Sequence, residues 1–223
     1  MVMGMMMMQD LNLLAVVGIA TCWGAVALAW LAGAIFYESK APAERARKAY
    51  ASPLWISTVI VVAVAVAVPG ADWRPLTFYA PPARILGLVI LLAATALAVW
   101  ARLALGAMWS AAPAVKQEHE LRTSGPYTLT RHPIYTGLLG MFLGTLLLAG
   151  GGRWIVAFPV YLVLLEFKIR AEERLMLAEF PGDYPRYRQR VPQLVPGLRL
   201  ISAHTHGVLI SVRAATTGHL GQS

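Results

Sequence analysis

Cysteine and charged side chains are both scarce in this sequence. Cys22 is the only cysteine among 223 residues, and it stands inside an apolar run. A single cysteine excludes a disulfide framework and a cysteine-based metal site. Charged residues make up only 13% of the chain and hydrophobic residues 58%, whereas a soluble domain carries about 25% charged residues. The composition therefore predicts a protein built for lipid.

Several signatures of soluble ligand-binding folds are missing as well. There is no phosphate-binding loop, and the glycine cluster at residues 150–152 stands between apolar runs rather than after a strand, which excludes a Rossmann site. His119 and His132 have no third ligand at a suitable spacing, so we expect no metal. The opening residues lack the basic segment and cleavage site of a signal peptide, so we expect none.

The formal net charge is +8, yet no nucleic-acid recognition motif accompanies it. We therefore expect no nucleic-acid partner and assign the positive charge to loops that face anionic lipid head groups. The expected partner of these loops is the lipid bilayer.

Apolar runs dominate the chain and predict an all-α integral membrane protein with about five transmembrane helices. The runs cover about Leu11 to Tyr37, Pro53 to Val68, Ala83 to Leu105, Pro133 to Ala149 and Trp154 to Phe167. They divide the chain into an N-terminal three-span region (1–105), a core with the last two spans (106–197) and a flexible or interfacial tail (198–223).

Lysine and arginine are distributed unevenly among the loops. The loops after the first and third runs, and the tail after the fifth, hold most of them, whereas the loops after the second and fourth hold few. The positive-inside rule therefore places the N-terminus outside and the C-terminus in the cytosol. An odd number of spans agrees with this multi-pass orientation.

Two features inside the runs predict how the helices pack. Gly140 and Gly144 have the small-xxx-small spacing that lets two helix backbones approach closely. We interpret them as packing residues. Pro159 predicts a kink in the fifth span.

The longest polar stretch between apolar runs extends from Val115 to Tyr135. It ends in Arg131-His132-Pro133, and proline suits the first turn of a helix. Arg131 and His132 are thus expected at a helix mouth, whose free N–H groups and dipole attract anions. The alternative is a basic juxtamembrane loop that keeps its charges in water.

Acidic residues follow the fifth run. If the helix continues, Lys168 and Glu172 lie one turn apart, and so do Glu166 and Arg170. Carboxylates at a membrane boundary are candidate functional residues, because their ionised forms are costly in hydrocarbon; the alternative is a helix that leaves the membrane with ordinary ion pairs. Aromatic and basic residues then alternate over residues 180–192, as in an interfacial segment lying on the membrane.

These segments together resemble the isoprenylcysteine carboxyl methyltransferase family, within a larger group of small membrane methyltransferases that includes phospholipid methyltransferases. The resemblance covers about residues 109–196. It rests on His119-x-Leu121, Gly125-Pro-Tyr127, Arg131-His-Pro-x-Tyr135, the Glu172-Glu173 pair and Phe180-x3-Tyr184-x2-Tyr187. It implies an enzyme that methylates an isoprenylcysteine-like carboxylate with S-adenosyl-L-methionine. The cofactor pocket would be cytosolic, built from the loop before the fourth helix and the segment after the fifth.

The resemblance also implies roles for individual residues. The expected cofactor-binding residues are His119, Glu120, Leu121, Arg122, Tyr127, His132, Pro133, Ile134 and Tyr135. Lys168 and Glu172 are expected to bind the substrate, and Arg131, Glu172 and Glu173 are the candidate catalytic residues. Lys168 stands where the family usually has arginine, and an ammonium group does not reproduce a bidentate fork.

The resemblance implies a lipophilic or small-molecule methyl acceptor as a further partner, and the chemistry leaves its identity open. Methyl transfer from a sulfonium to a carboxylate neutralises opposite charges, and a carboxylate is already ionised at neutral pH. A small thiol or a phospholipid amine would instead need a base, which Glu172 or Glu173 can supply. Two further alternatives are a sterol-type membrane reductase that binds a nicotinamide cofactor, and a non-catalytic membrane protein with the same fold.

Overall fold

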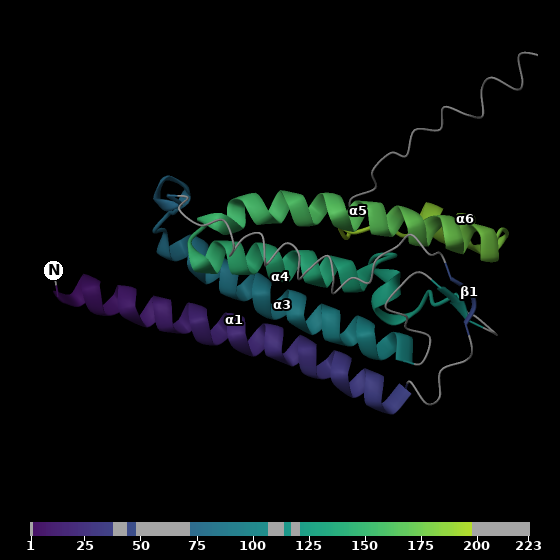
Figure 1. Ribbon diagram of the computed structural model, residues 1–223, viewed down its shortest axis with the longest axis horizontal. Coiled ribbons are helices and arrows are strands. Elements are labelled where there is room, and N and C mark those ends of the chain that lie inside the picture. The colour runs from purple at the N-terminus through teal and green to yellow at the C-terminus, as the bar shows by residue number, and fades with distance from the viewer. Residues whose placement is uncertain (1, 38–43, 48–71, 107–113, 117–120, 198–223) are drawn as a thin grey trace, which may run out of the picture.

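The computed structural model describes residues 2–37, 44–47, 72–106, 114–116 and 121–197 (Figure 1). The second predicted span and the predicted tail, 198–223, lie outside the described residues. The described part contains the helices α1 (Val2–Tyr37), α3 (Pro81–Leu105), α4 (Pro133–Ala149), α5 (Arg153–Glu179) and α6 (Asp183–Arg190). The 3-10 turns η2 (Arg74–Leu76) and η4 (Gly125–Thr128) and the strands β1 (Glu44–Arg47) and β2 (Ala114–Lys116) complete it.

Four of the predicted spans correspond to helices. α4 begins and ends at the predicted residues, with Pro133 in its first turn and Gly150 closing it in the left-handed conformation. α5 continues through Pro159 and past the predicted end of the fifth span to Glu179. The continuation predicted from the i,i+4 pairs is present, since Arg170 Nε donates to Glu166 Oε1 at 2.8 Å.

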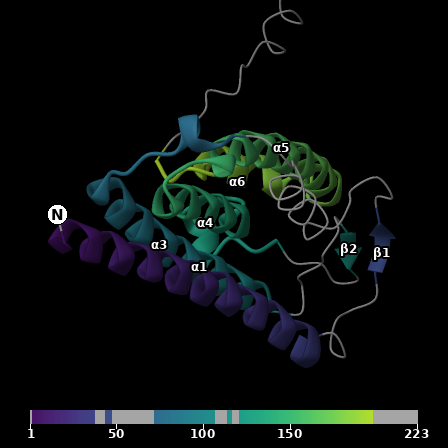
Figure 2. The ribbon, with the colours of Figure 1, turned by 60° about the vertical axis from the view of Figure 1, so that its left-hand side comes forward.

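The strands β1 and β2 pair antiparallel. They join the loop after α1 to the loop after α3, beyond one end of the helices (Figure 2). The prediction of an all-α fold holds for the helical core but missed this pair. Strands of four and three residues are too short to show an alternating pattern, so the sequence carries no signal for them.

Glycines bring α3 and α4 into close contact. A Cβ atom on Gly144 would lie 2.7 Å from the backbone nitrogen of Leu91, and one on Gly140 would lie 2.7 Å from the Cβ of Ala94. A Cβ on Gly87 of α3 would in turn meet the α4 backbone, 2.6 Å from the nitrogen of Leu148. The two helices thus approach each other backbone to backbone, and the interpretation of Gly140 and Gly144 as packing residues is confirmed.

The direction of each helix follows from its contacts. Near the start of both helices, Arg84 of α3 donates to the carbonyl of Leu11 in α1 at 3.1 Å. Near their ends, the Arg102 guanidinium occupies the space beside Gly33, so α1 and α3 run parallel. α4 runs antiparallel to α3, and α5 returns antiparallel to α4. One end of the bundle therefore gathers the ends of α1, α3 and α5 and the beginning of α4 (Figure 1); we call it the polar end.

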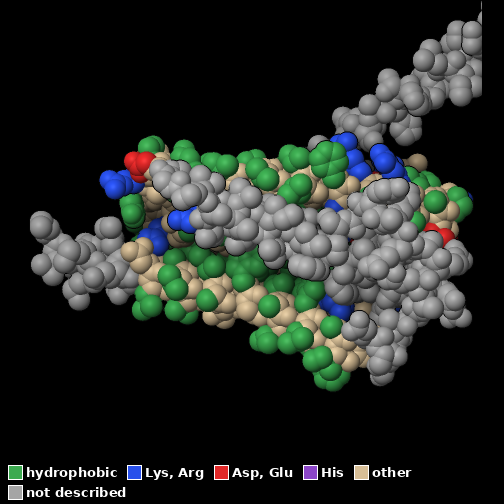
Figure 3. Space-filling view, in the orientation of Figure 1, with side chains coloured by type: hydrophobic (Ala, Val, Ile, Leu, Met, Phe, Trp, Pro, Cys, Tyr) green, Lys and Arg blue, Asp and Glu red, His purple; other side chains and the backbone are tan. Residues whose placement is uncertain are grey.

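Two helices are long and apolar enough to cross a membrane, Leu11–Tyr37 and Pro81–Leu105. Only 17% and 28% of their most apolar windows are buried inside the protein, whereas the core helix of a soluble protein would be mostly buried. α4 is a shorter apolar helix. Hydrophobic side chains extend along the visible helical surface (Figure 3). An apolar surface of this extent indicates a membrane protein. The five crossings and their orientation stay predictions.

Candidate active site

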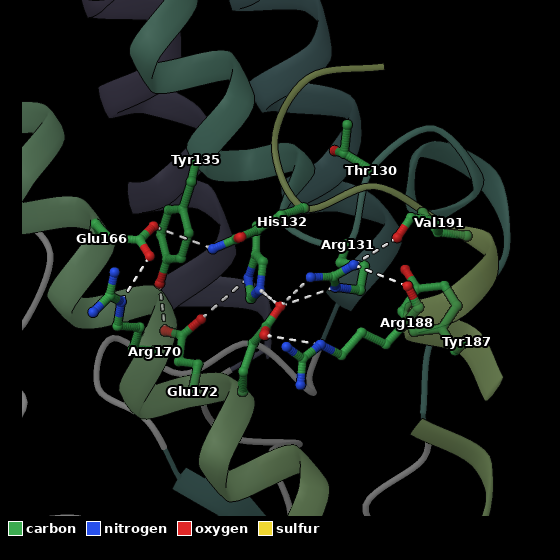
Figure 4. A network of polar contacts seen from close by, with 12 residues as sticks. Thr130, Arg131, His132, Tyr135, Glu166, Arg170, Glu172, Tyr187, Arg188 and Val191 are labelled. Atoms are coloured by element: carbon green, nitrogen blue, oxygen red, sulfur yellow. Dashed lines mark hydrogen bonds and ion pairs between the residues drawn. The ribbon is translucent and has the colours of Figure 1, made fainter. Parts of the chain in front are cut away.

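Two segments that are distant in the sequence meet at the polar end (Figure 4). Arg131 and His132 directly precede α4, and His132 is its N-cap residue. Glu172 and Glu173 lie on the extension of α5 beyond the predicted fifth span. The helix mouth predicted for Arg131 and His132 is therefore present, and the two carboxylates of α5 face it.

Glu173 is held by Arg131. The Nε and Nη2 atoms of Arg131 both donate to Glu173 Oε1, at 2.9 and 2.6 Å, and the Glu173 side chain is only 11% exposed. Burial by itself raises the pKa of Glu173. The close approach of the His132 ring and the hydrogen bonds and charge of Arg131 outweigh burial and lower that pKa to about 2. Glu173 is therefore a weak base at neutral pH.

The remaining donors of Arg131 bind backbone carbonyls in the last turn of α6 and after it. Its Nη1 donates to the carbonyl of Val191 at 2.7 Å. The backbone N–H groups of Arg131 and His132 donate to Pro192 and Gln193 at 2.8 and 3.2 Å. The N–H groups of Arg131 and His132 are therefore not available to an anion, because the chain after α6 folds back and accepts them. The anions at this helix mouth are the carboxylates of α5.

Glu172 has different partners. The hydroxyl of Tyr135 donates to Glu172 Oε1, and His132 Nδ1 lies 3.6 Å from Glu172 Oε2. The other ring nitrogen of His132, Nε2, lies 3.4 Å from Glu173 Oε1, an ion-pair contact without hydrogen-bond geometry. The imidazole also stacks on Tyr135, with ring centroids 5.6 Å apart. The Glu172 side chain remains 22% exposed, which makes it the accessible carboxylate of the pair.

Burial and charge act in opposite directions on His132. Burial alone would lower the pKa of the imidazole, but the carboxylates of Glu172 and Glu173 outweigh it, and the pKa of His132 is raised. The two glutamates therefore stabilise the charged form of the ring.

The aromatic residues of α6 close the site from the far side. Tyr184 and Tyr187 are buried, and the Tyr187 hydroxyl donates to the carbonyl of Tyr127 at 2.7 Å. These aromatic side chains thus pack into the protein, and the position of the segment on the membrane surface stays a prediction. Burial also raises the pKa of Tyr127, which keeps its hydroxyl protonated.

The other predicted site residues are distributed around this cluster. Pro133 and Ile134 are buried in the first turn of α4, and Lys168 is buried on α5. Leu121 and Arg122 precede η4 and are at least partly exposed. His119 and Glu120 lie outside the described residues.

Sequence reasoning missed the strap, residues 191–194, which crosses the beginning of α4. Besides the carbonyls already described, the Thr136 hydroxyl donates to the carbonyl of Leu194 at 2.7 Å. Gln193 Nε2 donates to Glu166 Oε2 at 3.2 Å, which ties the strap to α5. Backbone carbonyls carry most of these bonds, and any residue has a carbonyl, so no sequence signal was available.

Apolar helices with a buried, charged network at one end define a membrane protein with a candidate active site at the bundle end. Residues 85–178 match the isoprenylcysteine carboxyl methyltransferase (ICMT) family. The match agrees with the family that the resemblance suggested; it adds most of α3 and ends on α5.

Three curated relatives match segments of similar length. The chain is 35% identical over 83 residues to the protein-S-isoprenylcysteine O-methyltransferase of Schizosaccharomyces pombe, covering 36% of this chain and 34% of the relative. It is 43% identical over 79 residues to methanethiol S-methyltransferase 2 of Bradyrhizobium diazoefficiens, covering 34% and 29%. It is 35% identical over 89 residues to the cobalt-zinc-cadmium resistance protein CzcN of Cupriavidus metallidurans, covering 38% and 39%. The chain thus matches less than half the length of each of these relatives.

Proposed function

We propose that this chain is an integral membrane methyltransferase that uses S-adenosyl-L-methionine to methylate a lipophilic carboxylate of the isoprenylcysteine type. The observation that carries the proposal is the accessible Glu172 carboxylate, held between Tyr135 and His132 at the beginning of α4. This position lies at the polar end of an apolar bundle, where a polar donor and an apolar acceptor can both arrive. The match of residues 85–178 to the ICMT family supports the same activity.

The chemistry of the site fits such a cofactor. S-adenosylmethionine carries a positive sulfonium and a positive ammonium group, and Glu172 offers a partly exposed carboxylate to a cation. Buried Tyr127 and Tyr135 lie at the same end and offer apolar ring surface. Together with residues 119–122 and 132–134, these side chains would hold the cofactor, which supplies the transferred methyl group.

The residues of the chain would then orient the acceptor and exclude water. A carboxylate acceptor is already ionised at neutral pH and needs no base, so positioning and desolvation are the main tasks. Lys168, one turn before Glu172 on α5, is a cation that can pair with the acceptor. The Arg131–Glu173 pair fixes the loop before α4 against α5 rather than reacting.

A small thiol is the second candidate acceptor, and two observations favour it. A relative named methanethiol S-methyltransferase 2 is 43% identical over 79 residues. A thiol must lose its proton, and Glu172 stands in the open position that a base would need.

Ligand binding by the purified protein tests the proposal. In detergent, calorimetry should detect binding of S-adenosylhomocysteine by the protein. With labelled S-adenosylmethionine, the protein should transfer the methyl group to a prenylated cysteine analogue. A parallel assay with a small thiol separates the two acceptors. If the parent protein binds a nicotinamide dinucleotide instead, the chain is a reductase of the sterol type. If it binds neither molecule, the proposal that the chain is an enzyme of either kind is wrong.

A further inference from the structure

Both ring nitrogens of His132 face carboxylate oxygens. Nδ1 lies 3.6 Å from Glu172 Oε2, and Nε2 lies 3.4 Å from Glu173 Oε1. A neutral imidazole has one nitrogen that donates and one that only accepts, whereas an ionised carboxylate only accepts. In the neutral ring, one nitrogen would therefore hold its lone pair close to a negative oxygen. In the imidazolium form, both nitrogens carry a proton and both contacts are attractive.

The charges around the ring lead to the same state. Arg131 supplies one positive charge, and its Nε and Nη2 atoms both donate to Glu173 Oε1. The His132 side chain is only 9% exposed, and a buried carboxylate is costly unless a positive charge accompanies it. An imidazolium between the glutamates supplies a second positive charge to balance the second carboxylate.

Neighbouring elements contribute further titratable or charged groups. Arg188 of α6 has its Nε 3.7 Å from Glu173 Oε2, but its side chain is 39% exposed. Lys168 of α5 and Tyr127 of η4 interact electrostatically with Glu172. The hydroxyl of Tyr135 in α4 donates to Glu172 and so adds no charge.

We propose that His132 is an imidazolium bridge, a positioning residue that holds the Glu172 carboxylate and ties it to the Arg131–Glu173 pair. Tyr135 holds Oε1 of Glu172 and the bridge holds Oε2, so the two oxygens of the accessible carboxylate have separate partners. This role differs from the cofactor contact that the family resemblance implies for His132. The consequence for turnover rests on the proposed function, whereas the protonation state does not.

Nuclear magnetic resonance of the full-length protein in detergent, labelled in the histidine rings, tests the bridge without any substrate. The chain has five histidines, and we expect one ring to remain an imidazolium to higher pH than the others and than free histidine. His132→Asn should remove that signal. If this variant does not fold, the other four histidines are replaced by Gln, and the one histidine signal that remains belongs to His132. A His132 signal that titrates at or below free histidine would overturn the proposal.

Substitutions of the partners make the test specific. Glu172→Gln and Glu173→Gln each remove one of the two charges that face the ring, so each should lower the pH at which His132 titrates. Glu166→Gln is the matched control, because Glu166 lies on the same helix and pairs with exposed Arg170 instead. If Glu172→Gln and Glu173→Gln leave the titration of His132 as unchanged as the control does, the ring does not bridge these carboxylates.

An activity measurement separates positioning from cofactor contact. With the bridge lost, His132→Asn should lower kcat about tenfold or more while the Kd for S-adenosylhomocysteine changes by less than about threefold. A large rise in Kd at unchanged kcat would instead identify His132 as a cofactor contact and overturn the positioning role. Failure of the parent to bind S-adenosylhomocysteine or transfer a methyl group would refute the proposed function, yet the titration of His132 would still decide the bridge.

Discussion

Glu172 and Glu173 are adjacent in the sequence but differ in their surroundings. Successive residues on a helix point about 100° apart, so one carboxylate meets Arg131 while its neighbour meets Tyr135. Glu173 receives two hydrogen bonds from one guanidinium and is more buried. Glu172 keeps more of its side chain exposed. We therefore assign the chemical role to Glu172 and the anchoring role to Glu173.

The first residue-scale prediction concerns turnover in Glu172→Gln. If Glu172 acts as the base for a thiol, turnover should fall by roughly 10²–10⁴-fold, while the affinity for S-adenosylhomocysteine is largely kept. If it only orients a carboxylate acceptor, the loss should be smaller. Steady-state kinetics with both acceptors measure the difference. Turnover as in the parent for both acceptors would show that Glu172 takes no part.

The second residue-scale prediction concerns stability and pH. The pKa of Glu173 is about 2 against an ordinary 4.5, so its contribution is complete above pH 4.5 and is lost as the pH falls through about 2. The raised pKa of His132 acts in the opposite direction: its contribution is complete below the ordinary value of 6.5 and is lost as the pH rises through the raised value.

Thermal unfolding in detergent at several pH values measures both effects. Between about pH 4.5 and 6.5 both contributions should be complete. Glu173→Gln should be less stable than the parent in this window, and the difference should shrink as the pH falls towards 2. Glu166→Gln should keep the acid dependence of the parent. An equally steep acid dependence in Glu173→Gln would refute the role given to that ion pair.

At the scale of elements, the contact between α3 and α4 depends on missing side chains. A Cβ on Gly144 would lie 2.7 Å from the nitrogen of Leu91 and 2.8 Å from the carbonyl oxygen of Gly87. Backbone atoms on both sides would have to move, because no flexible side chain is there to give way. α4 begins at the candidate active site, so the packing of α4 on α3 also positions His132.

Gly144→Ala should therefore destabilise the protein by about 1–3 kcal/mol, as overpacking a tight interior does. Gly24→Ala is the matched control, because a Cβ on Gly24 of α1 meets nothing within 4 Å. The control should be neutral or gain up to about 1 kcal/mol from helix propensity. Comparing the thermal unfolding of the two variants decides the matter; equal stabilities would mean that the close approach contributes nothing.

For the whole molecule, the helix directions place two exposed positions at opposite ends of the bundle. Asp72 precedes η2 at the end opposite the site, and Arg174 lies on α5 at the polar end. Both side chains are exposed. The lysine and arginine distribution predicts that the polar end faces the cytosol.

Single cysteines at these two positions should therefore label from opposite sides of the membrane. The background is Cys22→Ala, which removes the chain's own cysteine. An impermeant thiol reagent added to sealed cells should modify Asp72→Cys, and Arg174→Cys should react only after permeabilisation. Modification of both without permeabilisation would refute the topology, and the reverse pattern would invert the orientation.

The sequence by itself determined where the described apolar helices lie, because apolar runs, proline at a helix start and glycine at a helix end are local signals. α4 begins and ends as predicted. The short motifs of the family resemblance also identified the candidate site residues Arg131, His132, Tyr135, Glu172 and Glu173 from the sequence. The short β1–β2 pair and the strap were missed, because they depend on backbone hydrogen bonds that any residue can make.

Only the tertiary structure decided which of these residues pair. Arg131 and Glu173 are 42 positions apart, and their contact depends on how α5 is rotated against α4. That rotation is set by packing between whole helix faces, as where Phe142 of α4 stacks on Tyr161 of α5. Both glutamates satisfy the same local pattern in the sequence. Packing distinguishes them by turning one carboxylate onto an arginine and leaving the other partly open.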